Sequence, residues 1–302
     1  MQKTDRKWLY IACILLQSVV YGLGNPLTKV GFASITVLWC LAVRFTLASL
    51  LLLAFGGKKA VAQLRAAGVG AWLPNSLCMA VAYISCNLAL GLTTATNVGF
   101  LMSLPVLFAP ILSVFLLKRK YPFRSLPVQL AVVAGLYMLC CGGGTFTFGL
   151  GEALSLLCAL SIAGTLVLSE RSITRLGPVA MAAAQTGVTA IISVAAALCF
   201  DDVAALGRVE PQAWLVVLYL ALICSCLAYV LQNVALSGLS ASAVSLLQCT
   251  QPVLTALFSF LLLGERLGLM GLAGAAVILV CVVVENYLGL RRERQASEAE
   301  KA

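Results

Sequence analysis

Hydrophobic residues fill this chain in long runs that are separated by short polar segments. A helix needs about 20 apolar residues to cross the hydrocarbon core of a bilayer. Ten runs reach that length: 8–28, 34–55, 70–91, 95–117, 125–143, 150–169, 178–200, 212–236, 240–263 and 268–289. The pattern therefore predicts an all-α integral membrane protein with ten transmembrane helices.

The first run resembles a signal peptide at its start, because Lys3, Arg6 and Lys7 precede it directly. It continues to about Leu27, however, and no small-residue cleavage site ends it. We therefore interpret it as the first membrane helix.

The same motif occurs once in each half of the chain. Ala-Tyr-x-x-x-Asn-x-Ala-Leu begins at Ala82 and again at Ala228, and Pro-Val-Leu-x-Ala begins at Pro105 and again at Pro252. A repeat of this length predicts two homologous halves, and internal repeats in a hydrophobic chain are typical of secondary transporters. The predicted units are a first five-helix repeat at 1–145, a second five-helix repeat at 146–290 and a charged cytoplasmic tail at 291–302. We expect the tail to be disordered or a frayed helix end.

Lysine and arginine are distributed unevenly between the two sides of the predicted membrane. If the N-terminus is cytoplasmic, sixteen of them lie in inside segments, and only Lys29, Arg208 and Arg266 lie outside. The positive-inside rule then predicts that both termini are cytoplasmic. Five helices per half place the halves in opposite orientations, which makes the repeat inverted. We expect a multi-pass protein of a bacterial cytoplasmic (inner or plasma) membrane.

The composition excludes several other classes of function. The chain is 62% hydrophobic and 10% charged, whereas a soluble protein averages about 25% charged residues. The net charge of +9 resides mainly in segments between apolar runs, so it fits orientation in a bilayer and predicts no nucleic-acid partner. The twelve cysteines form no C-x-x-C pair and there is no histidine. We therefore expect no metal site and no cofactor.

Short motifs in both halves occur in a recognisable order. The first half contains Tyr21-Gly22-x-Gly24-Asn25 and then Arg44-Phe45, and the second half ends in Leu263-Gly264-Glu265. Together with the duplicated blocks, they resemble the EamA-like family of the drug/metabolite transporter superfamily, from Tyr21 to about Glu285. The resemblance implies a small-molecule transporter that works by alternating access. It also implies a central cavity bounded by runs 1, 3, 4, 6, 8 and 9.

Polar residues inside the apolar runs are candidates for lining this cavity. Tyr83 and Asn87 are four residues apart and share one helix face, as do Tyr229 and Asn233. Polar side chains in hydrocarbon usually face the bundle interior or a water-filled cavity. Asparagine also holds helices together, and that alternative stays open. The substrate-binding candidates are Tyr83, Asn87, Tyr229, Asn233, Gln248, Gln251, Asn25 and Thr165. For Asn25 and Thr165, which lie on faces rich in small residues, close helix packing is an equal alternative.

Two prolines and one arginine interrupt the apolar runs. Pro105 and Pro252 each free the carbonyl four residues earlier, at Leu101 and Gln248. Such a carbonyl must find a partner or line a wet cavity, so both prolines are hinge candidates, with a tolerated kink as the alternative. Arg44 lies in the middle of a run, and we expect a structural charge with an acidic or carbonyl partner.

Amides, hydroxyls and two tyrosines with few fixed charges suit a neutral or zwitterionic molecule better than a phosphorylated one. The sequence therefore predicts a secondary transporter for an amino acid or similar metabolite, working as an exporter. A broad-specificity drug exporter or a vitamin or metabolite uptake permease are the alternatives. Proton coupling would require a carboxylate, and the acids near the runs are Glu152, Glu170, Glu265 and Glu285.

Two other classes of protein fit the sequence less well. A membrane-embedded enzyme would need a nucleophile, base or metal set inside the runs, and a receptor would be expected to carry long loops or a soluble domain. The predicted partners are a small-molecule substrate and the lipid bilayer, and a homodimer is compatible with this interpretation.

Overall fold

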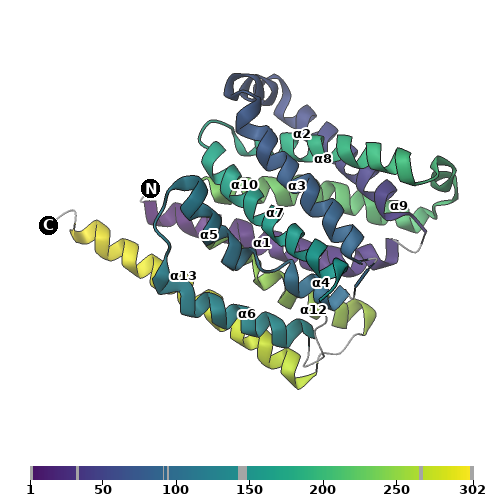
Figure 1. Cartoon of the computed structure of the whole chain (residues 1–302). Coiled ribbons are helices and arrows are strands. Elements are labelled where there is room, and N and C mark those ends of the chain that lie inside the picture. Colours follow the sequence, from purple (N-terminus) through teal and green to yellow (C-terminus); the bar gives the residue numbers. More distant parts are fainter. Residues whose placement is uncertain are drawn as a thin grey trace.

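The computed structural model describes residues 3–31, 34–90, 92–93, 95–141, 148–264 and 268–299. Every regular element in these residues is helical (Figure 1). Ten segments are long and apolar enough to cross a membrane: Lys7–Thr28, Val37–Ala67, Val69–Ala89, Val98–Leu117, Phe123–Cys140, Leu150–Ser172, Pro178–Phe200, Pro211–Leu236, Ala241–Leu262 and Leu269–Leu288. The predicted all-α protein with ten transmembrane helices is therefore confirmed. The predicted boundary between the two repeats, at residues 145 and 146, and Glu265 lie outside the described residues.

The structure divides the ten spans into thirteen α-helices, two 3-10 helices and one π-helix within the described residues. In the first half they are α1 (Lys3–Gly31), α2 (Val37–Ala67), α3 (Val69–Leu90), α4 (Ala95–Leu101), α5 (Pro105–Leu117), η1 (Phe123–Ser125) and α6 (Leu126–Cys141). In the second half they are α7 (Leu150–Ser172), α8 (Pro178–Phe200), η2 (Val203–Arg208), α9 (Pro211–Tyr219), the π-helix η3 (Leu220–Leu227), α10 (Ala228–Leu236), α11 (Ala241–Gln248), α12 (Thr250–Leu263) and α13 (Leu269–Ala299).

Spans 4 and 9 are both interrupted next to the prolines of the repeat. Span 4 breaks between α4 and α5, and Pro105 is the first residue of α5. Span 9 breaks at Cys249, and Pro252 lies in the first turn of α12. The Leu104 N–H donates to the Leu101 carbonyl over 3.1 Å, so this carbonyl finds its partner in a tightened turn rather than in a cavity.

The second helix is longer than its apolar run. It continues past residue 55 to Ala67, with a kink at Gly57, where φ is 51° and ψ is −149°. Glycine adopts this backbone conformation without the steric penalty of a side chain. Lys58 and Lys59 follow the kink directly, so the chain beyond it forms a short charged arm at one end of the span. At the other extreme of the chain α13 is helical to Ala299, so most of the predicted tail continues the last helix.

The main contacts between spans have the same pattern when the spans of one half are exchanged for those of the other. Span 2 packs on span 7 through α2 and α8, and span 5 packs on span 10 through α6 and α13. Span 1 packs on spans 8 and 9, and span 6 packs on spans 3 and 4. Adding five to each span number therefore reproduces the pattern. In Figure 1 the α6–α13 pair lies along one side of the bundle, and the start of α1 and the end of α13 lie at the same end.

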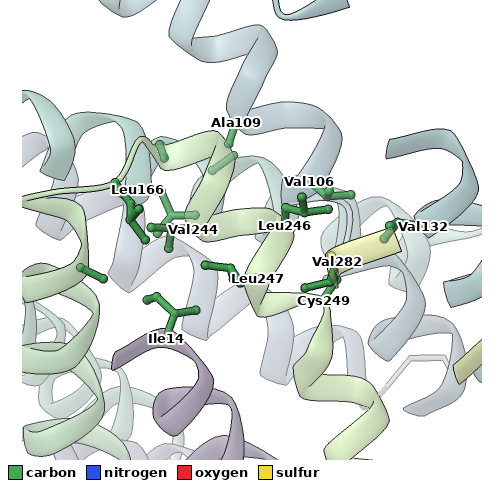
Figure 2. Packing of buried hydrophobic residues seen from close by; sticks show 14 of the residues in the cluster. Ile14, Val106, Ala109, Val132, Leu166, Val244, Leu246, Leu247, Cys249 and Val282 are labelled. Atoms are coloured by element: carbon green, nitrogen blue, oxygen red, sulfur yellow. The ribbon is translucent and has the colours of Figure 1, made fainter. Parts of the chain in front are cut away.

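The largest buried apolar cluster surrounds α11. Figure 2 shows Val244, Leu246 and Leu247 of this helix between Ile14 of α1 and Val282 of α13. Lipid tails are as apolar as these side chains, so helices in a bilayer associate mainly through close packing and interhelical hydrogen bonds. α11 is thus fixed by its neighbours on several sides.

Helices α6 and α13 approach each other closely at Gly135 and Gly274. A Cβ placed on Gly274 would lie 2.5 Å from the Gly135 carbonyl oxygen and 2.6 Å from the Leu139 nitrogen. Those atoms belong to the backbone and cannot rotate away. The absence of a side chain at Gly274 is therefore what lets these two helices touch.

Candidate functional site

One turn of α10 carries three polar side chains, Tyr229, Gln232 and Asn233, and all three are buried. Each belongs to a different hydrogen-bonded cluster. Buried polar groups in a membrane are costly unless they are paired. α10 is consequently the element on which the polar interior of the protein is centred.

The first cluster joins the two halves through their equivalent tyrosines. The Tyr229 hydroxyl donates to the Tyr83 hydroxyl over 2.8 Å. Arg44 lies beside them, with its guanidinium carbon 5.5 Å from the centre of the Tyr83 ring and 5.1 Å from that of Phe45. The Tyr21 side chain interacts with Tyr83 and lies within electrostatic range of Arg44. Helices α1, α2, α3 and α10 thus meet at one point.

Arg44 has a different partner from the one expected. Its Nε donates to the Ser225 hydroxyl over 2.6 Å, and no carboxylate or carbonyl pairs with it among the described residues. The expectation of an acidic or carbonyl partner was therefore wrong in this part of the chain. A neutral hydroxyl and two aromatic faces surround the charge instead.

Ser225 belongs to the π-helix η3, which precedes α10 directly. π-helical turns are rare, and those that occur often lie at functional sites. Nearby, the Tyr219 hydroxyl donates to the Val20 carbonyl over 3.2 Å, and the Cys224 thiol contacts the same carbonyl at 3.7 Å. These contacts attach the irregular segment to α1.

The second cluster consists of three glutamines from three helices. Gln17 Nε2 donates to Gln232 Oε1 over 2.9 Å. Gln248 Nε2 lies 3.0 Å from Gln232 Oε1 and 3.2 Å from Gln17 Oε1. The candidate Gln248 therefore belongs to an amide cluster that links α1, α10 and α11.

The third cluster links α7, α8 and α10. Asn233 Nδ2 donates to Gln185 Oε1 over 2.9 Å, and Gln185 Nε2 donates to the Ser169 hydroxyl over 2.9 Å. Asn233 is completely buried, and its Oδ1 accepts no hydrogen bond within the described part of the chain. The Asn233 Oδ1 is therefore a buried acceptor without a donor among the described residues.

The remaining candidates are not part of these clusters. Asn87 Nδ2 donates to the Tyr83 carbonyl of its own helix over 2.7 Å. Asn25 is exposed and donates to the Thr255 hydroxyl over 3.0 Å, while the buried Thr165 donates to the Ser161 carbonyl over 3.0 Å. Gln251 is half-buried and makes no hydrogen bond to a described residue. The two asparagines of the repeat thus have different environments.

Several polar residues of the interior were not among the sequence candidates. They are Tyr21, Gln17, Gln185, Ser225 and Gln232. A glutamine in the middle of an apolar run was the available signal for three of them. The clusters also use α2 and α8, which lie outside the six runs expected to bound the cavity.

The acidic residues near the spans are engaged at helix ends. Glu170 pairs with Arg119 and also accepts the Ala241 N–H over 2.7 Å, so it connects the ends of α5, α7 and α11. Glu152 accepts from Thr93 and, over 2.9 Å, from the Gly149 N–H. Glu285 of α13 accepts from Ser125, the last residue of η1, directly before α6. These carboxylates therefore link the ends of neighbouring helices.

A cavity of about 370 Å³ lies away from the tyrosine pair, where the arm of α2 meets α3 and α7. Its lining is Ala67, Gly70, Ala71, Pro74, Asn75, Leu168, Arg171, Ser172 and Arg175. No group of three His, Cys, Asp or Glu in the described residues could hold a metal ion.

Comparisons with known proteins agree with this architecture. The model of the EamA-like transporter family matches residues 8–141 and again residues 149–287. A protein of Archaeoglobus fulgidus that is named an uncharacterized transporter is 26% identical over 271 residues, which cover 90% of this chain and 83% of the relative. A solved crystal structure has the same fold, with a TM-score of 0.79 at 20% identity, over 93% of this chain and 97% of that one.

Proposed function

This chain belongs to the EamA-like transporter family, and we propose that it moves a small neutral or zwitterionic metabolite, such as an amino acid, out of the cell by alternating access. The family and the archaeal relative identify it as a multi-pass membrane transporter rather than an enzyme. The observation that carries the finer proposal is the hydrogen bond between Tyr83 and Tyr229. It joins equivalent residues of the two halves in the interior of the bundle.

An inverted repeat of residues 1–145 and 146–290 accounts for this contact. A two-fold pseudo-axis between two halves places a residue near the axis beside the equivalent residue of the other half. Tyr83 and Tyr229 are such a pair. The exchange rule for packing between spans supports the same relation. In transporters built this way, one half or bundle rocks against the other around a site near the membrane midplane.

The interrupted spans supply a mechanism for the rocking. The breaks before Pro105 and near Pro252 divide spans 4 and 9 at comparable places. Short non-helical connections of this kind absorb changes in backbone angle, so the two prolines act as hinges. The substrate binds beside them, against Tyr83, Tyr229, Asn233 and Gln248, while Asn25, Asn87, Thr165 and Gln251 contact it in other states of the cycle.

The proposed orientation has both termini in the cytoplasm of a bacterium, because inside segments hold most of the lysines and arginines. The carboxylate contacts at Glu170 and Glu285 then lie at the cytoplasmic end, and those at Glu152 lie at the outer end. Outward movement of a metabolite requires these two sets to open in alternation.

Flux measurements in oriented vesicles test the proposal. Inside-out vesicles from cells that overproduce the protein should accumulate at least one labelled amino acid of a full panel, and vesicles with the Tyr83→Phe, Tyr229→Phe double variant should accumulate much less. Accumulation only in right-side-out vesicles would replace export by uptake. Absence of any protein-dependent flux, in either orientation and for amino acids and lipophilic cations alike, would reject the proposed function.

A further inference from the structure

We propose that the Arg44 guanidinium binds the carboxylate of the transported molecule, so that the substrates are monocarboxylates, with amino acids among them. This inference rests on the proposed transport function and names the chemistry of its substrate. It also gives a functional role to an arginine for which the sequence predicted only a structural one.

The first observation is that Arg44 is a buried and uncompensated charge. The residue is 7% exposed and lies in α2, thirteen residues before the kink at Gly57. Arginine does not lose its proton in proteins, so this residue cannot escape burial by becoming neutral. Among the described residues no carboxylate pairs with it, and Glu152, Glu170 and Glu285 are bonded at helix ends. An ionisable residue within a membrane span is a functional-site candidate by default.

The second observation is the set of donors that the contacts leave free. Nε is used by Ser225 at 2.6 Å, and this bond fixes the plane of the guanidinium. The two terminal nitrogens make no hydrogen bond to a described residue. Two parallel N–H groups in one plane match the two oxygens of a carboxylate. The site therefore lacks one planar, singly charged acceptor.

The surroundings favour an anion over any other ligand. The faces of the Phe45 and Tyr83 rings stabilise the cation but bring no negative charge to it. The hydroxyls of Tyr21, Tyr83 and Tyr229 lie at the same place and can donate to a carboxylate oxygen. In this structure Tyr229 donates to Tyr83, and a bound carboxylate can replace that acceptor.

The charge count limits the ligand to one negative group. Arg44 is the one lysine or arginine in the middle of a predicted span. A phosphate group carries more charge and is usually held by several cations. One arginine among tyrosines instead fits the carboxylate of a small organic acid or of a zwitterion. The amide cluster of Gln17, Gln232 and Gln248, one turn further along α10, offers neutral polar groups for the rest of the molecule.

Binding to the purified full-length protein tests the proposal. The probes are the standard L-amino acids, lactate and benzoate. Each is compared with its carboxamide, in which a neutral amide replaces the carboxylate. We expect at least one carboxylate to raise the melting temperature and to bind at least about tenfold more tightly than its carboxamide, since a hydrogen-bonded charge is lost in the amide. Arg44→Gln should abolish this preference, and Arg44→Lys should keep part of it.

A second measurement separates binding from folding. Without ligand, Arg44→Met should leave the melting temperature unchanged or raise it, because replacing an uncompensated buried charge by an apolar side chain is often neutral or stabilising. Arg124→Gln makes the same change of charge at an exposed position and should leave the carboxylate preference intact. A structural arginine would give the opposite result, with a much lower melting temperature for Arg44→Met and unchanged ligand binding by the protein that folds.

Two results would overturn the inference. One is equal binding of carboxylates and their carboxamides by the wild-type protein, and the other is binding of none of the carboxylates. Either result leaves the transport function intact if the vesicles still move another compound, such as a neutral or cationic one. Loss of all flux with retained Arg44-dependent carboxylate binding would instead reject transport and keep the site.

Discussion

Tyr229 donates a hydrogen bond to Tyr83 over 2.8 Å, and the two residues occupy the same position in the two copies of the repeat motif. The asparagines one turn further along do not meet in this way. Asn233 bonds to Gln185 on another helix, whereas Asn87 bonds to its own backbone. The two copies of the motif therefore contact each other at the tyrosines, whereas their asparagines have different partners.

The tyrosine pair predicts a measurable coupling between the halves. Tyr83→Phe and Tyr229→Phe should each lower the free energy of unfolding, while the double variant should be destabilised by less than the sum, because both changes remove the same bond. We expect a coupling of about 0.6 kcal/mol, the average for interhelical hydrogen bonds in a membrane. Unfolding in mixed detergent micelles measures it. Strict additivity of the two changes would mean that the hydroxyls contribute independently.

The asymmetry between the two asparagines predicts unequal effects of the same substitution. Asn233→Leu removes the donor to Gln185 and leaves a buried amide oxygen unpaired, so it should cost about 1–3 kcal/mol of stability. Asn87→Leu removes only a bond within α3 and should cost much less. Thermal unfolding of both variants in one detergent provides the comparison. Equal losses would show that environment does not separate the two positions.

Close packing of α6 on α13 predicts a strong effect of one added methyl group. Gly274→Ala places a carbon 2.5 Å from the Gly135 carbonyl oxygen, and the two backbones must separate. We expect a loss of about 1–3 kcal/mol. Gly99→Ala in α4 is the control, since a Cβ there meets nothing within 4 Å. A Gly274→Ala protein as stable as this control would indicate that α6 and α13 separate freely.

The charge distribution predicts which loops a reagent reaches from outside the cell. On a cysteine-free background, Asp202→Cys should react with a membrane-impermeant maleimide in intact cells. Lys120→Cys should react only after the membrane is opened. Both positions are exposed, and Lys120 leaves the Arg119–Glu170 ion pair untouched. The reverse labelling pattern would invert the proposed orientation, and with it the assignment of the two ends of the bundle.

The transmembrane spans could be predicted because hydropathy is a local property. Each span needs only its own apolar length, and the predicted and observed ends differ by a few residues, apart from α2. That helix continues through Lys58 and Lys59 because the kink at Gly57 turns the chain where the apolar run stops. The sequence contains the glycine but does not show which way the helix turns.

The polar interior could be predicted only in part. The duplicated motif indicated Tyr83 and Tyr229, but Gln17 and Gln185 do not belong to a duplicated motif. The face that each of these helices turns towards its neighbours depends on how the two halves dock, which no single apolar run determines. The partner of Arg44 could not be predicted for a related reason, since Ser225 lies in a π-helix, which the apolar pattern of the run does not indicate.

The π-helix Leu220–Leu227 places an irregular backbone segment directly before the three buried polar residues of α10. An α-helix turns about 100° per residue, so a shift of one residue in the hydrogen-bond register of Leu220–Leu227 would rotate everything that follows by roughly that angle. Tyr229, Gln232 and Asn233 would then leave their three clusters together. A local exchange of backbone hydrogen-bond partners in this segment would therefore reorient all three side chains at once.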